Sequence, residues 1–271
     1  MVERYAVIGN PIAHSKSPQI HAAFANQTGQ HISYEAVLAP IDGFVATVKS
    51  LIAQGYKGAN VTVPFKIEAY NLSDELSERA TSAGAINTFR FNQNKIIGDN
   101  TDGVGLVRDL TLNYSHALKG ARILLLGAGG AAQGVMLPLI NAQPASMTIA
   151  NRSLEKAHNM MQKINLQPTV CNLLVSHYEN LQSEFDVIIN ATSTGLNDTY
   201  LTISNAIFAK NCLAYDMMYG RETPFMAQAR STGAHVADGL GMLVEQAAEA
   251  FYLWRGVRPK TAPIIAMLRN K

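Results

Sequence analysis

The chain has 271 residues, of which 48% are hydrophobic and 15% are charged, a composition typical of a globular protein with one large or two ordinary domains. Its net charge of +2, without a run of basic residues, argues against a nucleic-acid partner. The two cysteines, Cys171 and Cys212, are isolated and lack the spacing of metal ligands, so we expect no metal site and a reducing compartment.

Strands alternate with helical segments along the whole chain, and this pattern predicts an α/β fold with mostly parallel sheets. The N-terminal sequence MVERYAVIGN indicates a strand rather than a signal peptide, so we expect a cytoplasmic protein without a membrane partner. In the first hundred residues we predict strands over 5–8, 32–38 and 59–63, and helices over 18–28 and 42–54. A hairpin of 86–91 and 95–97 should follow, closed by Asn92, Gln93 and Asn94.

A glycine turn follows the apolar run of residues 124–126, which is typical of a strand buried on both faces. Gly127, Gly129 and Ala132 match G-x-G-x-x-G/A at the start of a helix that begins near Gly130. We expect the backbone of residues 127–131 and the positive end of this helix to hold a pyrophosphate. The alternative is a purely structural turn, since any tight strand-to-helix connection favours glycine.

The second strand of this segment, over 147–150, runs into Asn151 and Arg152, where an NAD site would usually carry an acid. A carboxylate there would repel a 2′-phosphate, whereas a guanidinium can bind it through two N–H groups. We therefore predict NADP(H) as the cofactor. The alternative is that Arg152 is an ordinary solvated residue at a strand end.

Further strands, over 186–189, 213–215 and 235–237, should continue the sheet of the glycine turn. A helix over 243–254 follows the last strand directly, and we expect it to return to the N-terminal part of the chain. The prediction is therefore an α/β substrate-binding domain of residues 1–101 with 240–271 and a Rossmann-type NADP-binding domain of residues 102–239, with a cleft between them.

Three polar strings of the first predicted domain are candidates for chemistry. HSKSP places Ser15 and Ser17 in the turn before a helix, where they could bind a carboxylate or simply cap the helix. NVTVPFK places Lys66 beyond the carboxyl end of a strand, where open α/β sheets bind ligands, although most lysines are solvated surface residues. GDNTDG places Asp102 before a helix, as a functional carboxylate or as a helix cap.

Together these strings resemble the shikimate dehydrogenase family. The matching strings are GNPIAHSKSP, GANVTVPFK, AGAINT, GDNTDG, GAGGAA, NRS, INATSTG, YDMMY with Thr223-Pro224, and ADGLGMLVEQAA. They occur in order from residue 9 to residue 248 and so cover nearly the whole chain. The resemblance implies the reversible reduction of 3-dehydroshikimate to shikimate with NADPH, a step of aromatic amino-acid biosynthesis.

The resemblance also implies the roles of individual residues. Lys66 would be the acid–base group, with Asp102 beside it and no metal. Ser15 and Ser17 would bind the substrate carboxylate, and the further substrate contacts would be Asn60, Thr62, Lys66, Asn87, Asp102, Tyr219 and Gln246. The cofactor contacts would be Gly127, Ala128, Gly129, Gly130, Ala131, Asn151, Arg152, Ser153, Lys156, Thr192, Met217 and Gly239. Taken alone, Asn87 could be a turn residue, Gln246 a helix-surface amide, and Met217 and Met242 core residues.

The chain departs from the commoner family pattern at Ser153, where Thr is usual, and at Lys156, where Arg is usual. A lysine offers a point charge rather than a fork, so we expect NADP to be preferred less strictly.

Two alternatives remain open at this point. One is a quinate/shikimate dehydrogenase that uses both NAD and NADP, disfavoured because Ser153 and Leu154, and no acid, follow Arg152 directly. The other is a non-catalytic NADP(H) sensor, against which Lys66 and Asp102 argue together. We expect a small-molecule substrate and a monomer or homodimer.

Overall fold

A computed structural model describes residues 2–92, 95–164, 171–196 and 199–270. Gln93 and Asn94, predicted to close a hairpin, lie outside the described residues. The chain divides into a first unit, Met1–Gly105 with Leu243–Lys271, and a second unit, Leu106–Met242. It passes from one unit to the other within two helices, α5 (Asp102–Arg108) and α9 (Leu240–Arg255), rather than at the turns before them, where pattern reasoning had placed the exchange.

The first unit contains a mixed sheet with the strand order β2-β1-β3-β5-β6-β4. Its strands are β1 (Glu3–Gly9), β2 (Ile32–Leu38), β3 (Gly58–Val61), β4 (Glu75–Leu76), β5 (Thr88–Asn92) and β6 (Lys95–Asp99). Strand β1 is parallel to β2 and β3, whereas β5 is antiparallel to both β3 and β6. The predicted strands and hairpin are present, but β3 ends two residues early because the chain turns at Thr62, whose carbonyl accepts from the Phe65 amide at 3.0 Å.

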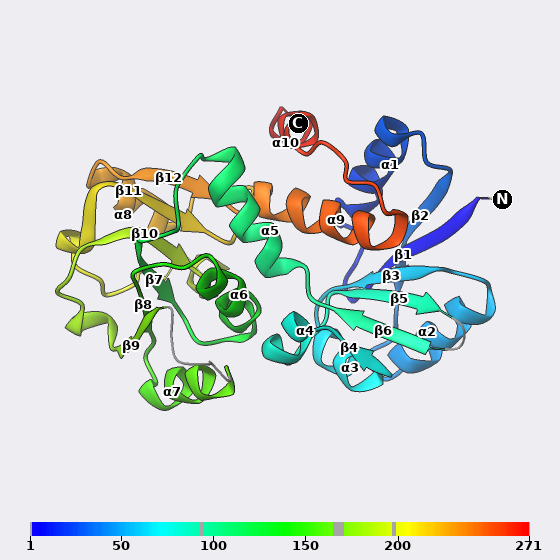
Figure 1. The fold of residues 1–271 in the computed structure, drawn as a ribbon, viewed down its shortest axis with the longest axis horizontal. Helices are drawn as coiled ribbons and strands as arrows, with labels where there is room; N and C mark the ends of the chain where they lie inside the picture. Colours follow the sequence, from blue (N-terminus) through cyan, green and yellow to red (C-terminus); the bar gives the residue numbers. More distant parts are fainter. Residues whose placement is uncertain (1, 93–94, 165–170, 197–198, 271) are drawn as a thin grey trace. The chain divides into compact units, whose positions relative to one another are not determined.

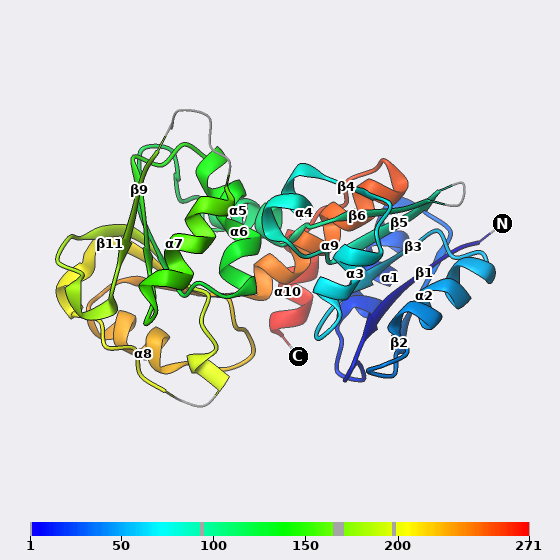
Figure 2. The same cartoon turned by 90° about the horizontal axis from the view of Figure 1, so that it is seen from below.

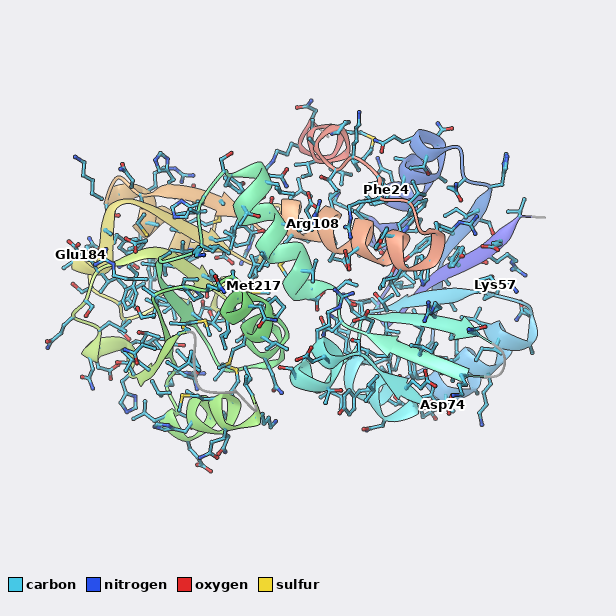
Figure 3. All side chains as sticks on the ribbon, viewed as in Figure 1. Phe24, Lys57, Asp74, Arg108, Glu184 and Met217 are labelled. Carbon is cyan, nitrogen blue, oxygen red and sulfur yellow. The ribbon has the colours of Figure 1, made fainter. Side chains whose placement is uncertain are left out.

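Helices cover both faces of this sheet. They are α1 (Ser17–Thr28), α2 (Phe44–Ala53), α3 (Lys66–Leu72), α4 (Glu78–Ala83), most of α9, and α10 (Ala262–Arg269). Figures 1 and 2 show α1 and α9 on one face and α2 and α3 on the other. Phe24 of α1, labelled in Figure 3, meets Phe251 of α9 edge to face at 5.8 Å, and Trp254 donates to the Phe89 carbonyl at 2.9 Å. Helix α9 therefore packs on the N-terminal sheet, as expected for the predicted helix over 243–254.

The second unit contains a parallel sheet with the order β12-β11-β10-β7-β8-β9. Its strands are β7 (Arg122–Leu126), β8 (Ser146–Ala150), β9 (Asn172–Ser176), β10 (Phe185–Asn190), β11 (Phe208–Asp216) and β12 (His235–Asp238). Numbered within the unit, this is the order 3-2-1-4-5-6 of a dinucleotide-binding fold, read from the opposite edge. The predicted Rossmann-type fold is confirmed, and its topological switch point lies between β7 and β10.

Two apolar layers sandwich this second sheet. On one face, α6 (Gly130–Asn141) and α7 (Leu154–Lys163) pack on alternate strand residues such as Leu125 and Ile189. On the other face, α8 (Pro224–Ser231) packs on Leu124 and Ile188. All four of these strand residues are fully buried, which explains the unbroken apolar run seen in the sequence. No helix among the described residues is both long and apolar enough to span a membrane.

Candidate functional site

In the first unit, the polar strings meet at one edge of the sheet. Strands β1 and β3 are parallel neighbours, so their carboxyl ends lie together there, and the Asn10 amide donates to the Val63 carbonyl at 3.1 Å. Thr62 lies beside Gly9, where an added Cβ would come within 2.5 Å of Thr62 Cγ2. Because β5 is antiparallel to β3, the start of β5 and the end of β6 reach the same edge. The topology thus places Asn87 and Asp102 beside the turns after β1 and β3.

An ion pair between Lys66 and Asp102 lies at this edge. Lys66 is the first residue of α3 and Asp102 the first residue of α5, and Lys66 Nζ lies 2.6 Å from Asp102 Oδ2. The two side chains are 31% and 19% exposed, so ligand atoms can reach the amine although it is partly shielded. Asp102 Oδ1 accepts from Asn87 Nδ2 at 2.7 Å. The carboxylate at the start of α5 therefore binds the side chains of both Asn87 and Lys66. A lysine held in this way can deliver a proton to a ligand oxygen.

Asn87 is the centre of a buried amide network. Its Nδ2 donates to Gln246 Oε1 at 3.2 Å, and its Oδ1 accepts from the Thr101 amide at 2.9 Å. Gln246 in turn donates to the Leu243 carbonyl at 2.8 Å. Asn87 is only 3% exposed, so its hydrogen-bonding groups need these partners. It is a buried network residue rather than a simple turn residue, and Gln246 is half-buried rather than a free helix-surface amide.

The network extends to the turn that carries the two predicted serines. Asn60 donates to the Asn87 carbonyl at 3.1 Å and accepts from the Tyr34 hydroxyl at 2.7 Å. Burial raises the pKa of Tyr34 well above its usual value, and a hydrogen bond with Ser17 opposes this shift. Ser15 Oγ accepts from the Ser17 amide at 3.3 Å. Sequence reasoning missed Tyr34, whose place in the strand 32–38 gave no sign that its hydroxyl would join Ser17 to Asn60.

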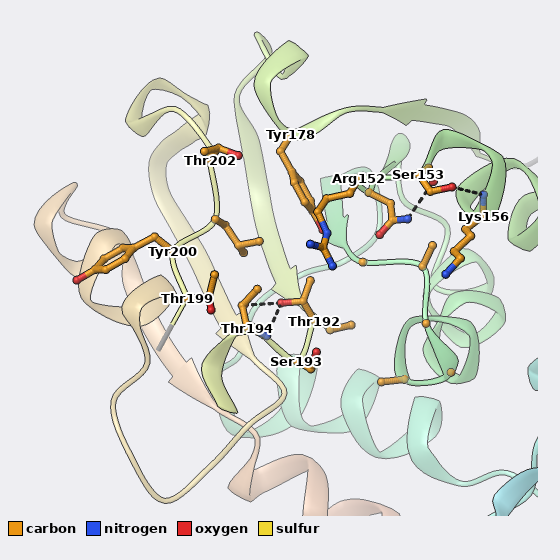
Figure 4. A pocket seen from close by; sticks show the side chains of 18 residues that line it. Arg152, Ser153, Lys156, Tyr178, Thr192, Ser193, Thr194, Thr199, Tyr200 and Thr202 are labelled. Carbon is orange, nitrogen blue, oxygen red and sulfur yellow. Dashed lines mark hydrogen bonds between the residues drawn. The ribbon is translucent and has the colours of Figure 1, made fainter. Parts of the chain in front are cut away.

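In the second unit, a cavity of about 1010 Å³ opens at the switch point of the sheet (Figure 4). Gly127 has a φ of +104°, and an added Cβ would lie 3.1 Å from Thr192 Cγ2. Glycine is therefore required where the turn after β7 passes the turn after β10. At Gly129 and Gly130, which begin α6, a Cβ would meet no atom within 4 Å. The backbone at this helix start is open to an anion, so the residues present fit a bound pyrophosphate.

The end of β8 supplies positive charge to the same cavity. Arg152 and Lys156 both line the cavity, and Figure 4 shows Arg152 beside Tyr178. Asn151 Nδ2 donates to the Ser153 carbonyl at 2.9 Å, and Ser153 Oγ caps α7 by accepting from the Lys156 amide at 3.4 Å. These contacts hold the segment between Arg152 and Lys156. Two exposed cations next to a phosphate-binding turn suit an additional phosphate on a dinucleotide.

Most of the predicted cofactor contacts line this cavity, and two do not. The lining residues predicted from the sequence are Gly127, Ala128, Gly129, Gly130, Ala131, Asn151, Arg152, Ser153, Lys156 and Thr192. Met217 instead packs partly buried against the core, and Gly239 lies against it, with an added Cβ only 2.2 Å from the Met217 carbonyl oxygen. Met242 is a core residue, 8% exposed. Tyr219 is also outside the cavity lining, and burial raises the pKa of its hydroxyl.

Hydroxyl-bearing residues that the sequence reasoning missed form another part of the cavity lining. They are Tyr178, Ser193, Thr194, Thr199, Tyr200 and Thr202. Thr194 is tied to Thr192, whose hydroxyl lies 2.6 Å from its own, and Thr192 donates to Asn190 at 2.7 Å. The string INATSTG contains Thr192, Ser193 and Thr194, but only Thr192 was predicted from the sequence. Within the described ranges, no cluster of His, Cys, Asp and Glu could hold a metal ion.

Three family profiles match this chain in succession. The profile of the shikimate dehydrogenase substrate binding domain matches residues 7–89, and that of shikimate / quinate 5-dehydrogenase matches residues 109–204. The profile of the shikimate 5′-dehydrogenase C-terminal domain matches residues 239–269. The first profile contains most of the polar edge, and the second contains the glycine turn.

Curated relatives and solved structures agree with these profiles. The chain is 59% identical over 270 residues to shikimate dehydrogenase (NADP(+)) of Methylobacillus flagellatus, with 99% of each chain covered. It is 55% identical to the protein of the same name from Nitrosospira multiformis, with 100% of this chain and 98% of the relative covered. A crystal structure of an Ael1 enzyme from Pseudomonas putida is 44% identical, with a TM-score of 0.94 and 98% of each chain covered. Shikimate 5-dehydrogenase from Thermus thermophilus, in complex with NADP(H) and shikimate, is 31% identical, with a TM-score of 0.87 and 99% of each chain covered.

Proposed function

Because the chain belongs to the shikimate dehydrogenase family, we propose that it catalyses the reversible NADPH-dependent reduction of 3-dehydroshikimate to shikimate in aromatic amino-acid biosynthesis. The observation that carries the proposal is the Lys66–Asp102 pair, joined at 2.6 Å and held by Asn87 at the sheet edge. The reaction requires a proton donor at a ketone oxygen, and a buried amide network can orient one there.

Lys66 is the proposed acid in the direction of reduction. When bound, NADPH supplies a hydride to the ring carbon. As the carbonyl bond becomes a single bond, the ammonium of Lys66 gives a proton to the oxygen, which becomes a hydroxyl, and the amine is left neutral. Asp102 holds the lysine in place and balances its positive charge, since the carboxylate lies in contact with Nζ. In the oxidation of shikimate, the neutral amine takes the proton back from the hydroxyl.

The polar groups of the sheet edge are the proposed substrate contacts. Ser15, in the turn before α1, and Ser17, the first residue of α1, bind the substrate carboxylate. The ring hydroxyls are bound by the amides and hydroxyls of Asn60, Thr62, Asn87, Tyr219 and Gln246, together with Lys66 and Asp102. Such a site favours a polyol, because an analogue that lacks a hydroxyl leaves a buried polar group unpaired.

The cavity of the second unit is the proposed NADP(H) site. The turn of Gly127 to Ala131 and the start of α6 bind the pyrophosphate, and Arg152 with Lys156 binds the 2′-phosphate. Asn151 and Ser153 hold the segment that carries these cations. We propose that Thr192, Met217 and Gly239 serve the nicotinamide half, although only Thr192 lines the cavity.

The cellular setting is proposed on separate grounds. Cys171 and Cys212 are both free and buried, as suits a reducing compartment, and we place the protein in the cytoplasm. We propose a monomer or homodimer that acts on a small molecule without a nucleic-acid partner. Sedimentation equilibrium of the purified protein would give the oligomeric state.

A steady-state assay of four reactions tests the function. Shikimate and quinate are each oxidised with NADP⁺ and with NAD⁺, and the formation of reduced nicotinamide is followed. We expect the highest kcat/KM for shikimate with NADP⁺. Comparable rates with quinate and with NAD⁺ would instead identify a quinate/shikimate dehydrogenase. A folded protein that binds NADP⁺ but turns over neither substrate would be a cofactor sensor.

A further inference from the structure

Arg79, on the short helix α4, binds two carboxylates at once. Its Nε lies 2.6 Å from Asp99 Oδ1 and its Nη2 lies 2.8 Å from Asp99 Oδ2, which makes a two-pronged contact. Its Nη1 lies 3.0 Å from Glu249 Oε1 on α9. The arginine is 21% exposed and the two acids are 15% and 9% exposed, so solvent screens these pairs only partly. A lysine has its three N–H groups on one atom, so it lacks the planar fork that binds both oxygens of Asp99.

One arm of Arg79 fixes the turn that carries Asp102. Asp99 ends β6, and its Oδ1 also accepts from Ser77 Oγ at 2.6 Å and from the Asn100 amide at 2.7 Å. The backbone carbonyl of Asp99 accepts from the Asn87 amide at 3.1 Å. Asn100 Oδ1 then accepts from the Asp102 amide at 3.1 Å. Asp99 is therefore joined to Asn87 by a direct hydrogen bond and to Asp102 through Asn100.

The other arm fixes α9 near Gln246. Glu249 stands one helical turn beyond Gln246, so the two side chains lie on the same side of the helix. Arg258 also binds Glu249, and its guanidinium lies 4.6 Å from the centre of the Tyr252 ring. Arg79 thus connects the turn of Asp102 to the helix of Gln246, the two elements that Asn87 contacts at 2.7 and 3.2 Å.

We propose that Arg79 is a positioning residue for the substrate site, which sets the distance between the Asp102 turn and Gln246 without touching the substrate. The inference rests on the function proposed above. Its physical basis is that Asn87 can bind Asp102 and Gln246 at the same time only when these two residues are held at a fixed distance from each other. A displacement of the order of 1 Å at such a site is sufficient to cost about 10²-fold in rate.

The first test is Arg79→Lys, which keeps the charge and removes the fork. We expect kcat/KM for shikimate to fall by about 10- to 100-fold, while the KM for NADP⁺ changes by no more than about twofold. The matched control is Arg122→Lys, because Arg122 makes a similar two-pronged contact with Asp186, at 3.1 and 2.8 Å, in the second unit. The control should lose stability without losing kcat/KM for shikimate.

Two further variants separate positioning from simple stabilisation. Glu249→Gln removes the charge that Arg79 and Arg258 both bind on α9 and leaves the Asp99 arm intact, so it should lower kcat/KM for shikimate less than a folded Arg79→Lys does. In the background of Gln246→Ala, Arg79→Lys should cost clearly less than it does alone, because both changes disrupt one network. Thermal unfolding of every variant shows whether the protein is folded at the assay temperature.

The outcomes are distinct. Wild-type kcat/KM for shikimate in folded Arg79→Lys and Glu249→Gln proteins would overturn the inference while leaving the proposed function intact. Full additivity with Gln246→Ala would also overturn it. An absence of shikimate turnover in the wild-type protein would reject the proposed function and, with it, the inference.

Discussion

Replacement of Arg152 by alanine should change cofactor preference, and the structure sets the size of the change. Arg152 lines the cavity beside Lys156, and both side chains are exposed. A hydrogen bond to a charged group is worth about 1.5 to 3 kcal/mol, and exposure to solvent puts Arg152 at the lower end, about 1.5 to 2 kcal/mol. The kcat/KM for NADPH should therefore fall by about 10- to 30-fold in Arg152→Ala. The value for NADH should change little, since NADH lacks the 2′-phosphate.

The assay measures kcat/KM for both cofactors in the wild type, Arg152→Ala, Lys156→Ala and a charge-matched control. Lys163→Ala is that control, because Lys163 is an exposed cation at the other end of the same helix and does not line the cavity. Lys156→Ala should cost NADPH less than about 5-fold, as for an exposed charge pair, and Lys163→Ala should leave the ratio unchanged. Raised salt should weaken NADPH more than NADH. An NADPH-to-NADH ratio that is the same in Arg152→Ala as in the wild type would refute the phosphate clamp.

Three other perturbations test the first unit. Lys66→Ala should lower kcat by roughly 10²- to 10⁴-fold with unchanged NADP⁺ binding by calorimetry, and near-normal turnover in the folded variant would remove Lys66 from the mechanism. Ser15→Ala and Ser17→Ala should each weaken shikimate by about 10- to 150-fold and leave NADPH unaffected, whereas an equal loss for NADPH would contradict the assignment of this turn. Burial lowers the pKa of His21 to about 3, so the neutral ring stabilises the fold above pH 6.5 and this contribution is lost as the pH falls towards 3. Between pH 7 and pH 5 the wild type should lose about 2 kcal/mol of unfolding free energy that His21→Phe retains, since the phenyl ring can still stack on Tyr34 as the imidazole does at 4.1 Å. Equal losses for the two proteins in urea unfolding would show that His21 takes up its proton in the folded protein as readily as in the unfolded chain, so that its pKa is not lowered.

Local patterns in the sequence were sufficient for most of the longer elements and for the cofactor turn, but they did not predict strand β9. The run Leu124 to Leu126 indicated a strand buried on both faces, and its residues are fully buried. The glycine spacing predicted the strand-to-helix turn because a positive φ at Gly127 and an open helix start depend on residues close in sequence. Short elements such as β4 and α4 were not predicted, since two to six residues carry too little periodicity to stand out.

The tertiary structure decided which side chains meet. The sequence placed Lys66 and Asp102 near element ends, but their contact at 2.6 Å depends on the antiparallel pairing of β5 with β3, which brings the end of β6 to the edge where β3 ends. Tyr34 and Arg79 were not identified from the sequence, because their hydrogen-bond partners are distant in the chain. A hydrogen bond requires atoms to lie within about 3 Å, and only strand order and helix packing bring residues far apart in the chain to that distance.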